Sequence, residues 1–434
     1  MRSMTRVIAA FAVLAALGLM AAGCGSGSSS SSGGKKAEVV ITCESCVVTA
    51  AKDDTFAQFY KQLTAAFNAK YKGRYHVKVT PFKPANDADA AQHYQREGAT
   101  GTLPDLFTEQ SNVIQSVART GGLTDLAPYL SKDPAWKDSF VPNAFVSQTD
   151  AQGHIWGVPE QSDTIGIFYN KALFQKAGIA AFPTTWDELL TACTKLKASG
   201  VIPFAMDGDW VTQLMWSNLI GTQPGGAAFL QAGIAKGGLA DNPTVVKATE
   251  YLKQMHTSGC VNKDAFTGDY NRAAAPFLAG QAAMVANGPW MAADIANAKL
   301  KLKDIGYVPS PGSGLIVVTG SAGWASGAKD AAHREAAVAF LKFLTSSSEM
   351  YRKALMTGSY WPIKEQLTAA QVKQLEPLSY NLIQQAKNVT YTYPNSKFAT
   401  PEAFSSTWIN DWPAYVQGGM STASFLNALS DTLR

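Results

Sequence analysis

The cysteines carry the clearest potential chemistry in the sequence, because thiols form disulfides, bind metals and undergo redox reactions. Cys43 and Cys46 are spaced as C-x-x-C, which is typical of a redox pair or of half a zinc site. A zinc site would need a second pair of ligands, and no histidine is followed by another histidine at metal spacing. We therefore expect structural disulfides, with Cys43 bonded to Cys46 and Cys193 bonded to Cys260, while a redox pair or free thiols are the alternatives. We expect no metal and no cofactor.

Carboxylates are the next candidates, since two of them about 5 to 10 Å apart could cleave a glycosidic bond. Asp163 with Asp207 or Asp209 is such a candidate pair. The sequence contains no G-x-S-x-G, no H-E-x-x-H and no G-x-x-x-x-G-K-[ST] motif, which excludes the common hydrolase, metalloprotease and nucleotide-binding signatures. We expect a protein that is not an enzyme.

Length, charge and residue composition exclude several classes of protein. A chain of 434 residues has a length typical of two to three domains, and charged residues make up only 16% of it. The net charge of +4 is too small for the basic footprint of a nucleic-acid-binding protein. No run of like charges, heptad array or internal repeat indicates a charged tail, a coiled coil or a solenoid.

The N-terminus indicates export. Arg2 and Arg6 precede the apolar run from Val7 to Met20, which is too short to span a bilayer comfortably and is typical of a signal peptide. The following A-A-G-C at 21–24 resembles the lipobox of bacterial lipoproteins, which implies cleavage after residue 23 and acylation of Cys24. The Gly- and Ser-rich segment of residues 24–37 then predicts a flexible tether between a membrane and a globular body.

Alternating strand and helix patterns follow the tether. Val39–Thr42 and Tyr75–Thr80 have strand patterns, and the apolar spacing over Thr55–Lys72 predicts an amphipathic helix between them. The same reasoning predicts a strand at Leu103–Phe107, a helix at Val113–Thr120, a helix opened by the capping box T-W-D-E at 185–188, a strand at Val201–Met206, helices at Val245–Met255 and Ala336–Leu344, and a mainly helical C-terminal region. This order predicts α/β lobes with mostly parallel sheets, whose ligand sites lie at carboxyl ends of strands or between lobes.

Four short stretches resemble the extracellular solute-binding proteins of bacterial ABC importers, specifically family 1 and its sugar-binding group. They are G-V-P at 157–159 continuing to Y-N-K at 169–171, P-T-T-W-D-E-L at 183–189, F-L-A-G-Q-A-A-M-V-A-N-G-P-W at 277–290, and S-A-G-W at 321–324 before a helix ending in F-L-K-F-L at 340–344. The resemblance covers most of the chain from Val39 to Leu433, and the order and spacing of these stretches carry it.

The resemblance implies a two-lobed α/β fold that binds its ligand in the cleft by hinge closure, with three crossings between the lobes. It implies an N-lobe of residues 38–164 plus 317–346 and a C-lobe of residues 165–316 plus 347–434. Partners would be a carbohydrate, and membrane permease subunits with a separate ATPase. The chain would be a monomer held by Cys24 at the outer face of the cytoplasmic membrane.

A sugar offers apolar ring faces and a rim of hydroxyls, so its site needs aromatic side chains for stacking and polar side chains for hydrogen bonds. The resemblance places Trp290 and Trp210 at aromatic positions of the cleft, and Trp210 also follows the carboxyl end of a predicted strand. Further candidate contacts are Glu109, Gln110, Asn112, Asp163, Asp209, Trp324, Tyr360 and Trp361. Trp408 and Trp412, four residues apart on a predicted helix, are expected in the core.

We therefore expect capture of a mono- or oligosaccharide for uptake. The cleft candidates are mostly Glu, Gln, Asp and Trp, which favours neutral hydroxylated ligands over anions. The alternatives are a cationic or peptide cargo in the same fold, since cations also bind aromatic faces, and an exported carbohydrate-active enzyme.

Overall fold

The computed structural model describes residues 37–44, 55–84, 87–141, 144–160, 162–298, 300–312, 316–319, 322–359, 363–364, 367–387, 391–392 and 400–433. The chain divides into two units, Met1–Ala37 and Glu38–Arg434, and the fold below is that of the second unit. The expected signal peptide and Cys24 lie outside the described residues. In the described part of the chain, no helix combines the length and the apolar character that a membrane span requires.

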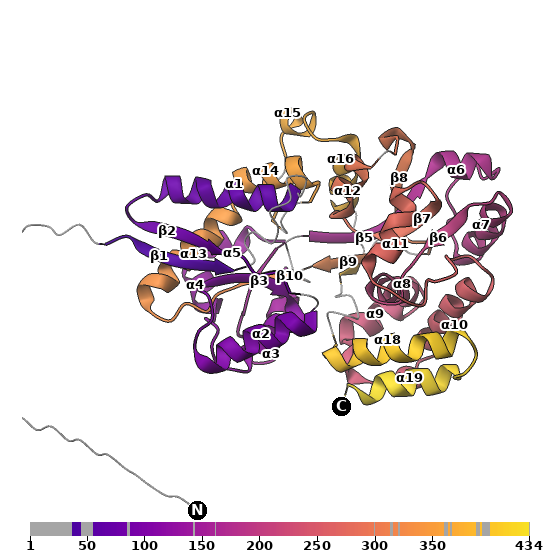
Figure 1. Cartoon of the computed structure of the whole chain (residues 1–434), viewed down its shortest axis with the longest axis horizontal. Helices are drawn as coiled ribbons and strands as arrows, with labels where there is room; N and C mark the ends of the chain where they lie inside the picture. Colours follow the sequence, from indigo (N-terminus) through magenta and orange to yellow (C-terminus); the bar gives the residue numbers. More distant parts are fainter. Residues whose placement is uncertain are drawn as a thin grey trace, which may run out of the picture. The chain divides into compact units, whose positions relative to one another are not determined.

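Two β-sheets organise two lobes (Figure 1). The first sheet has the strand order β2-β1-β3-β10-β4, and the second has the order β11-β9-β5-β7-β6, with β8 paired to β5. The strands of the first sheet are β1 (Val39–Glu44), β2 (Tyr75–Thr80), β3 (Leu106–Gln110), β4 (Val158–Pro159) and β10 (Ala322–Ala325). Those of the second sheet are β5 (Ser162–Asn170), β6 (Ile202–Ala205), β7 (Ala282–Asn287), β8 (Ile305–Val308), β9 (Ile316–Thr319) and β11 (Tyr391–Thr392).

Strand directions differ from the sequence prediction of mostly parallel sheets, which is wrong. β1 pairs in parallel with β2 and β3, but β10 runs antiparallel to β3 and β4. In the second sheet β5 runs antiparallel to β7, β8 and β9, whereas β6 is parallel to β7 and β11 is parallel to β9. β10 joins its sheet from a distant part of the chain, so no local strand–helix–strand crossover fixes its direction.

Helices cover both sheets. The first lobe contains α1 (Thr55–Lys70), α2 (Asp87–Thr100), α3 (Ser111–Ala118), α4 (Ala127–Lys132), α5 (Pro134–Asp138), η1 (Val146–Gln148), α13 (Ala331–Leu344) and α14 (Ser347–Thr357). The second contains α6 (Lys171–Lys176), α7 (Trp186–Ala198), α8 (Trp210–Gly221), α9 (Gly226–Ala232), η2 (Ile234–Lys236), η3 (Leu239–Asp241), α10 (Pro243–Thr257), α11 (Tyr270–Leu278), α12 (Met291–Asn297), η4 (Leu302–Asp304), α16 (Pro377–Lys387), α18 (Glu402–Val416) and α19 (Thr422–Asp431). α15 (Ala369–Val372) precedes α16.

Each sheet is buried on both faces, because helices cover both. Successive strand residues point to opposite sides, so neighbours on one strand pack into different clusters. On β3, Leu106 packs with α1 and α13 while Phe107 packs with α2 and α3. In the second lobe, Ile167 and Phe168 of β5 divide in the same way between two clusters. The first sheet is therefore the middle of three layers. The loops that follow the carboxyl ends of its strands can present side chains at the edge of these layers.

Two local predictions are confirmed in the second lobe. Thr185 and Glu188 form the reciprocal capping box at the start of α7. On the same helix, Cys193 is bonded to Cys260, which lies 67 residues later, and the two Cα atoms are 5.0 Å apart. Cys43 is buried in β1, but the predicted partner Cys46 lies outside the described residues, so that pairing stays a prediction.

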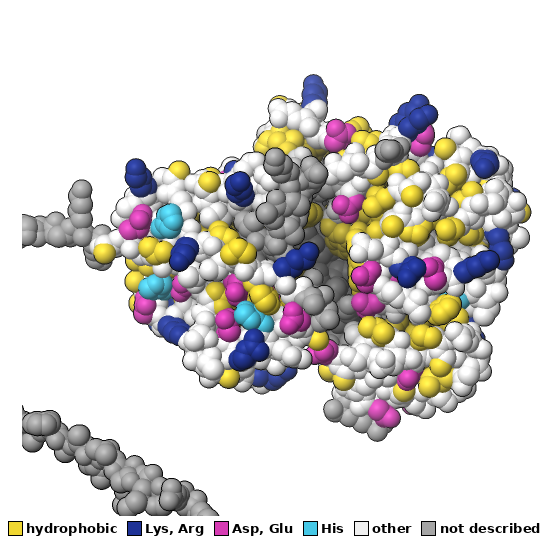
Figure 2. All heavy atoms as spheres, viewed as in Figure 1, with side chains coloured by type: hydrophobic (Ala, Val, Ile, Leu, Met, Phe, Trp, Pro, Cys, Tyr) yellow, Lys and Arg dark blue, Asp and Glu magenta, His cyan; other side chains and the backbone are white. Residues whose placement is uncertain are grey.

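The chain passes between the sheets after Pro159 and again after Thr319, since β4 and β10 lie in the first sheet and β5 and β9 in the second. β9 therefore belongs to the second sheet, although the resemblance assigned residues 317–319 to the N-lobe. Later, α14 contacts α1 of the first lobe, and α16 contacts β8 of the second. On the face shown in Figure 2, basic and acidic side chains are interspersed, in keeping with the small net charge.

Candidate ligand-binding site

The junction of β3 and α3 carries polar side chains whose hydrogen-bonding capacity is unused. Gln110 ends β3, and Ser111 and Asn112 begin α3. In the described part of the chain, Gln110 Oε1, Ser111 Oγ and Asn112 Oδ1 are all buried without a hydrogen-bond partner. Gln110 also makes no side-chain cap to α3. Since buried polar atoms are normally hydrogen-bonded, three consecutive exceptions make this junction a candidate place for a polar ligand.

Asn112 also lines a cavity of about 450 Å³. Its first-lobe wall comes from α2 and α3 and includes Gln95 and Arg119. Its second-lobe wall is residues 400–402, at the start of α18. The predicted residue Asn112 therefore lies in a cavity that residues of both lobes line. Glu109, the residue before Gln110, is half-buried, and its backbone pairs with Gly323 of β10.

An aromatic cluster occupies the ends of three helices in the second lobe. Trp210 begins α8, Tyr270 begins α11, and Trp290 directly precedes α12. The rings of Trp210 and Tyr270 stack, with centroids 5.3 Å apart and planes 15° apart. Trp210 and Trp290 lie 5.7 Å apart with planes tilted by 58°. All three residues are half-buried, so the core does not enclose them completely.

The turn before α12 fits the indole of Trp290 closely. A Cβ added to Gly288 would collide with the Trp290 ring, so only glycine allows this approach. Asn287 is fully buried and donates a hydrogen bond from Nδ2 to Tyr270 Oη at 3.4 Å. Burial, assisted by the nearby carboxylate of Asp294, raises the pKa of Tyr270 above its ordinary value.

Asp207 positions the start of α8 and hence Trp210. Its buried carboxylate accepts hydrogen bonds from the backbone N–H groups of Asp209 at 3.0 Å, Val211 at 3.3 Å and Thr212 at 3.1 Å. Burial raises the pKa of Asp207 to about 7, although these backbone hydrogen bonds oppose the shift. The predicted residue Asp209 is half-buried beside Trp210 and accepts a hydrogen bond from Gln213 Nε2 at 3.4 Å.

Of the other predicted contacts, one is buried in the core and the rest lie wholly or partly outside the described residues. Trp324 is 0% exposed and packs against Tyr60 and Phe340 with ring centroids 5.5 and 5.9 Å away, so we assign it to the core rather than to the site. The backbone of Asp163 pairs with Val318, and its side chain lies outside the described part of the chain. Tyr360 and Trp361 lie outside the described residues.

Sequence reasoning missed two residues near these positions. Tyr270 joins the aromatic cluster only through the fold, and the sequence around it carries no signal. Glu160 directly follows the G-V-P motif at 157–159, shortly before β5, and its hydrogen bonds connect it to α1, β3 and α14. Its carboxylate accepts hydrogen bonds from Tyr60 Oη and from Thr108 Oγ1, the latter at 3.0 Å, and its backbone carbonyl accepts one from Lys353 Nζ at 3.2 Å. Burial, reinforced by Glu160, raises the pKa of Tyr60 well above its ordinary value.

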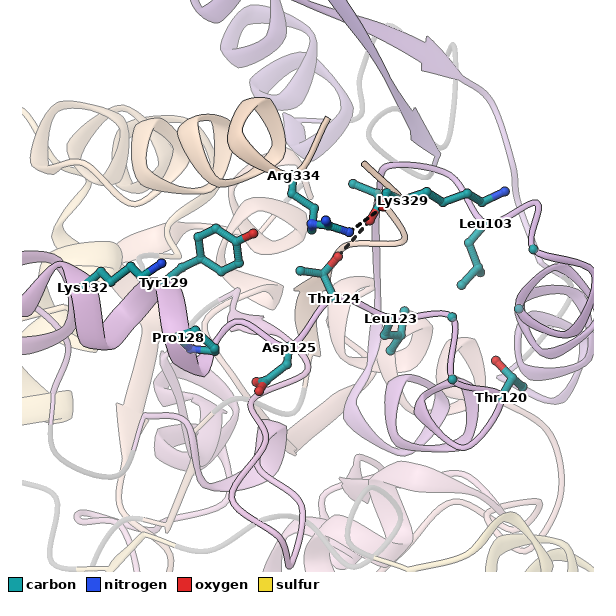
Figure 3. A pocket seen from close by; sticks show the side chains of 15 residues that line it. Leu103, Thr120, Leu123, Thr124, Asp125, Pro128, Tyr129, Lys132, Lys329 and Arg334 are labelled. Atoms are coloured by element: carbon teal, nitrogen blue, oxygen red, sulfur yellow. Dashed lines mark hydrogen bonds between the residues drawn. The ribbon is translucent and has the colours of Figure 1, made fainter. Parts of the chain in front are cut away.

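A larger cavity of about 630 Å³ lies within the first lobe (Figure 3). Its rim carries Lys132, Lys329 and Arg334, and Thr124 donates a hydrogen bond to the Ala328 carbonyl at 3.2 Å on its wall. None of the predicted ligand-binding residues lines it, so we do not assign it to the candidate site.

The chain has two sheets with helices on both faces, and it passes between them from β4 to β5 and from β9 to β10. Polar and aromatic groups lie near the ends of strands. These features are those of a two-lobed solute-binding protein. The chain belongs to the bacterial extracellular solute-binding protein family, whose family model matches residues 53–351. Members are extracytoplasmic binding components of ABC transporters and are not enzymes.

Relatives and solved structures agree with this assignment. The chain is 24% identical over 303 residues to the multiple sugar-binding protein of Streptococcus mutans, covering 67% of this chain and 68% of that protein. It is 24% identical over 241 residues to the sn-glycerol-3-phosphate-binding protein UgpB of Rhizobium meliloti, covering 52% of this chain and 54% of that protein. A chitin oligosaccharide binding protein has a similar fold, with a TM-score of 0.76 at 22% identity over 91% of this chain and 98% of that chain. The fold and family expected from the sequence are thus confirmed.

Proposed function

We propose that the protein captures a neutral mono- or oligosaccharide between its lobes and delivers it to a membrane permease driven by a separate ATPase. The observation that carries this proposal is the half-buried cluster of Trp210, Tyr270 and Trp290, because aromatic rings that the core does not fully enclose suit the apolar face of a sugar ring. The names of several relatives, which include the multiple sugar-binding and maltotriose-binding proteins, support the same cargo class.

The polar atoms at the start of α3 complement this aromatic cluster. Sugar hydroxyls both donate and accept hydrogen bonds, so they could satisfy Gln110 Oε1, Ser111 Oγ and Asn112 Oδ1 together. In the proposed mechanism the aromatic cluster binds the ring face, the lobes close, and the polar atoms gain their partners. Asp163, Asp209, Glu109, Tyr360 and Trp361 complete the proposed set of contacts.

The remaining parts of the proposal concern location and assembly. Acylated Cys24 would anchor a monomer to the outer face of the cytoplasmic membrane, with residues 24–37 as the tether. Cell fractionation of the wild type and of Cys24→Ser tests this anchor, because only the wild type should stay with the membranes. A membrane-bound Cys24→Ser variant would contradict it.

Thermal unfolding of the full chain against a panel of solutes tests the cargo. The panel contains neutral oligosaccharides, sn-glycerol 3-phosphate, polyamines and peptides, and each sugar is recovered and analysed afterwards. At 100 times its dissociation constant, a ligand adds about 2.7 kcal/mol and raises the midpoint by several degrees. We expect this shift with one class of sugar, recovered intact.

Two variants make the panel specific to the aromatic cluster. Trp210→Ala should lose most of the sugar-induced shift. Trp156→Ala is the matched control, because Trp156 is also half-buried but belongs to the first lobe, where Nε1 donates a hydrogen bond to Asp150 Oδ2 at 2.9 Å. A shift from a polyamine, peptide or phosphate ester alone would overturn the sugar assignment, and cleaved sugar would identify an enzyme.

A further inference from the structure

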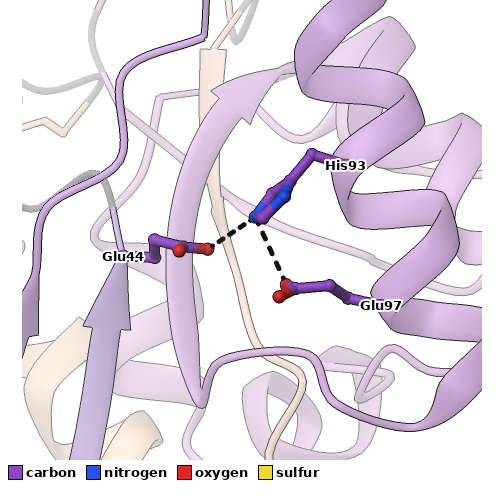
Figure 4. A group of neighbouring side chains, drawn as sticks. All are labelled: Glu44, His93 and Glu97. Atoms are coloured by element: carbon purple, nitrogen blue, oxygen red, sulfur yellow. Dashed lines mark hydrogen bonds and ion pairs between the residues drawn. The ribbon is translucent and has the colours of Figure 1, made fainter.

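Three metal-binding side chain types meet where β1 ends beside α2 (Figure 4). Glu44 is the last residue of β1, and His93 and Glu97 lie on α2. Four residues apart on a helix, His93 and Glu97 share one face, and that face points toward Glu44. These residues belong neither to the candidate sugar site nor to the predicted C-x-x-C site.

Two of the three separations match those between ligands around one small cation. His93 Nε2 lies 3.1 Å from Glu44 Oε2 and 3.5 Å from Glu97 Oε2, and one ligand atom from each of the three residues lies within 4.8 Å of the others. Ligands bound tetrahedrally at about 2.0 to 2.1 Å from zinc lie about 3.3 Å from one another. The two measured separations fall on either side of this value.

Hydrogen bonding among the three side chains leaves one oxygen unsatisfied. A single Nε2 can donate only one proton, and the shorter contact directs it to Glu44. Glu97 Oε2 is buried and has no hydrogen-bond partner in the described part of the chain, where its contact with His93 Nε2 at 3.5 Å is an ion pair only if the imidazole is protonated. A buried carboxylate oxygen without a hydrogen bond is costly, and a cation would remove that cost by contacting all three ligand atoms.

The surroundings hold the imidazole in place while leaving a path for an ion. The ring of Phe82 stacks on His93 with centroids 4.0 Å apart and planes 19° apart. The side chains of Glu44, His93 and Glu97 are 15%, 18% and 23% exposed, so water can reach the cluster. The site is thus oriented by packing and accessible on one side.

We propose that Glu44, His93 and Glu97 bind one divalent cation of the zinc class, with water completing the coordination. One imidazole nitrogen with two carboxylate oxygens suits zinc better than magnesium or calcium, which prefer sets of oxygen ligands. Two carboxylates also balance the charge of the ion. The bound ion would join the end of β1 to α2 and so stabilise the first lobe.

Zinc binding to the chelator-treated full chain, measured by equilibrium dialysis with metal analysis, tests this site. We expect one zinc per chain and a zinc-dependent rise in the unfolding midpoint, with no comparable rise from magnesium or calcium. His93→Gln should weaken zinc binding about tenfold or more. His333→Gln is the matched control, because His333, whose side chain is 36% exposed, contacts a single carboxylate within the described residues, that of Asp330, at 2.7 Å.

Cysteines elsewhere in the chain could bind zinc if their disulfides were reduced, and two further measurements distinguish them from the proposed site. Cobalt substituted for zinc should give the visible bands of a tetrahedral nitrogen and oxygen site without sulfur charge-transfer absorption. If His93→Gln is too unstable without metal, Glu97→Gln takes its place and should show the same loss. Zinc binding equal in the wild type and in these variants, or no zinc binding by the wild type, would overturn the proposal.

Discussion

Two tryptophan pairs in the second lobe differ in how far they are exposed. Trp408 and Trp412 of α18 are 0% exposed and stack with ring centroids 5.0 Å apart and planes 12° apart. Trp210 and Trp290 lie 5.7 Å apart, tilted by 58°, and both are half-buried. The first pair has no surface left for a ligand, whereas the second pair is not fully enclosed.

Helix α8 links the two pairs. It begins at Trp210, and Trp216 lies further along it, fully buried with its ring centroid 5.3 Å from that of Trp408. The core pair therefore holds the helix that presents the half-buried pair. The difference teaches that exposure separates tryptophans that can only pack from those that a ligand could reach, and variants at each pair should change different properties.

The largest effect should come from the core pair. Trp412→Ala removes a fully buried indole that contacts Tyr415, Phe425 and His256, so it should lower the free energy of unfolding by about 3 to 5 kcal/mol. Chemical denaturation of the unliganded chain measures this loss. Trp412→Phe should lose less and should keep the affinity for sugar. A large affinity loss in a folded Trp412→Phe variant would break the comparison.

The next effect concerns pH and the start of α8. Because burial raises the pKa of Asp207 to about 7 from 3.8, the folded chain holds this proton more tightly than the unfolded chain. The free energy of unfolding should therefore fall as pH rises from about 4 to about 7, by up to about 4 kcal/mol, and level off above that range. Asp207→Asn should lack this slope in denaturation curves recorded across the range. An identical slope in the variant would show that Asp207 is not its source.

The half-buried pair should respond in affinity instead. Trp290→Ala removes a stacking face, so it should weaken sugar binding by about 2 kcal/mol, or about 30-fold, with a smaller loss of stability than Trp412→Ala. Isothermal titration with the sugar identified by the panel measures the change. Trp290→Phe keeps an aromatic face and should recover part of the affinity. Equal affinity in all three proteins would remove Trp290 from the site.

Much of the fold could be predicted because local patterns encode it. The predicted helix at Thr55–Lys72 and the capping box at residues 185–188 correspond to α1 and α7, since apolar spacing and capping act within one element. Strand direction was predicted less well. It depends on which distant segments meet, as when β10 enters the first sheet beside β3, and no local pattern records that.

The candidate site shows the same division. Trp408 and Trp412 were expected in the core from their spacing on a helix, and the structure confirms this burial. Trp324 was predicted to bind ligand but is buried, because it lies in a strand of small residues, Ala322–Ala325, that is covered on both faces and lacks an alternating pattern. The Glu44, His93 and Glu97 cluster has no simple sequence signature, because it combines a His–Glu pair four residues apart on one helix with a third residue from β1, rather than two closely spaced histidines.

The smallest expected effect concerns the polar atoms at the start of α3 in the first lobe, which we compare with the pair Trp210 and Trp290. Among the described residues, Asn112 Oδ1 is buried without a hydrogen-bond partner, so it should cost stability in the unliganded protein and gain a hydrogen bond if a ligand binds there. Asn112→Ala should therefore weaken sugar binding by about 1 kcal/mol, or about fivefold, while leaving the unliganded midpoint unchanged or slightly higher. Gln115→Ala is the matched control, because Gln115 lines the same cavity but has no such buried atom. A lower unliganded midpoint with unchanged affinity would assign Asn112 to folding rather than to binding, and the aromatic pair would then stand as the site's main determinant.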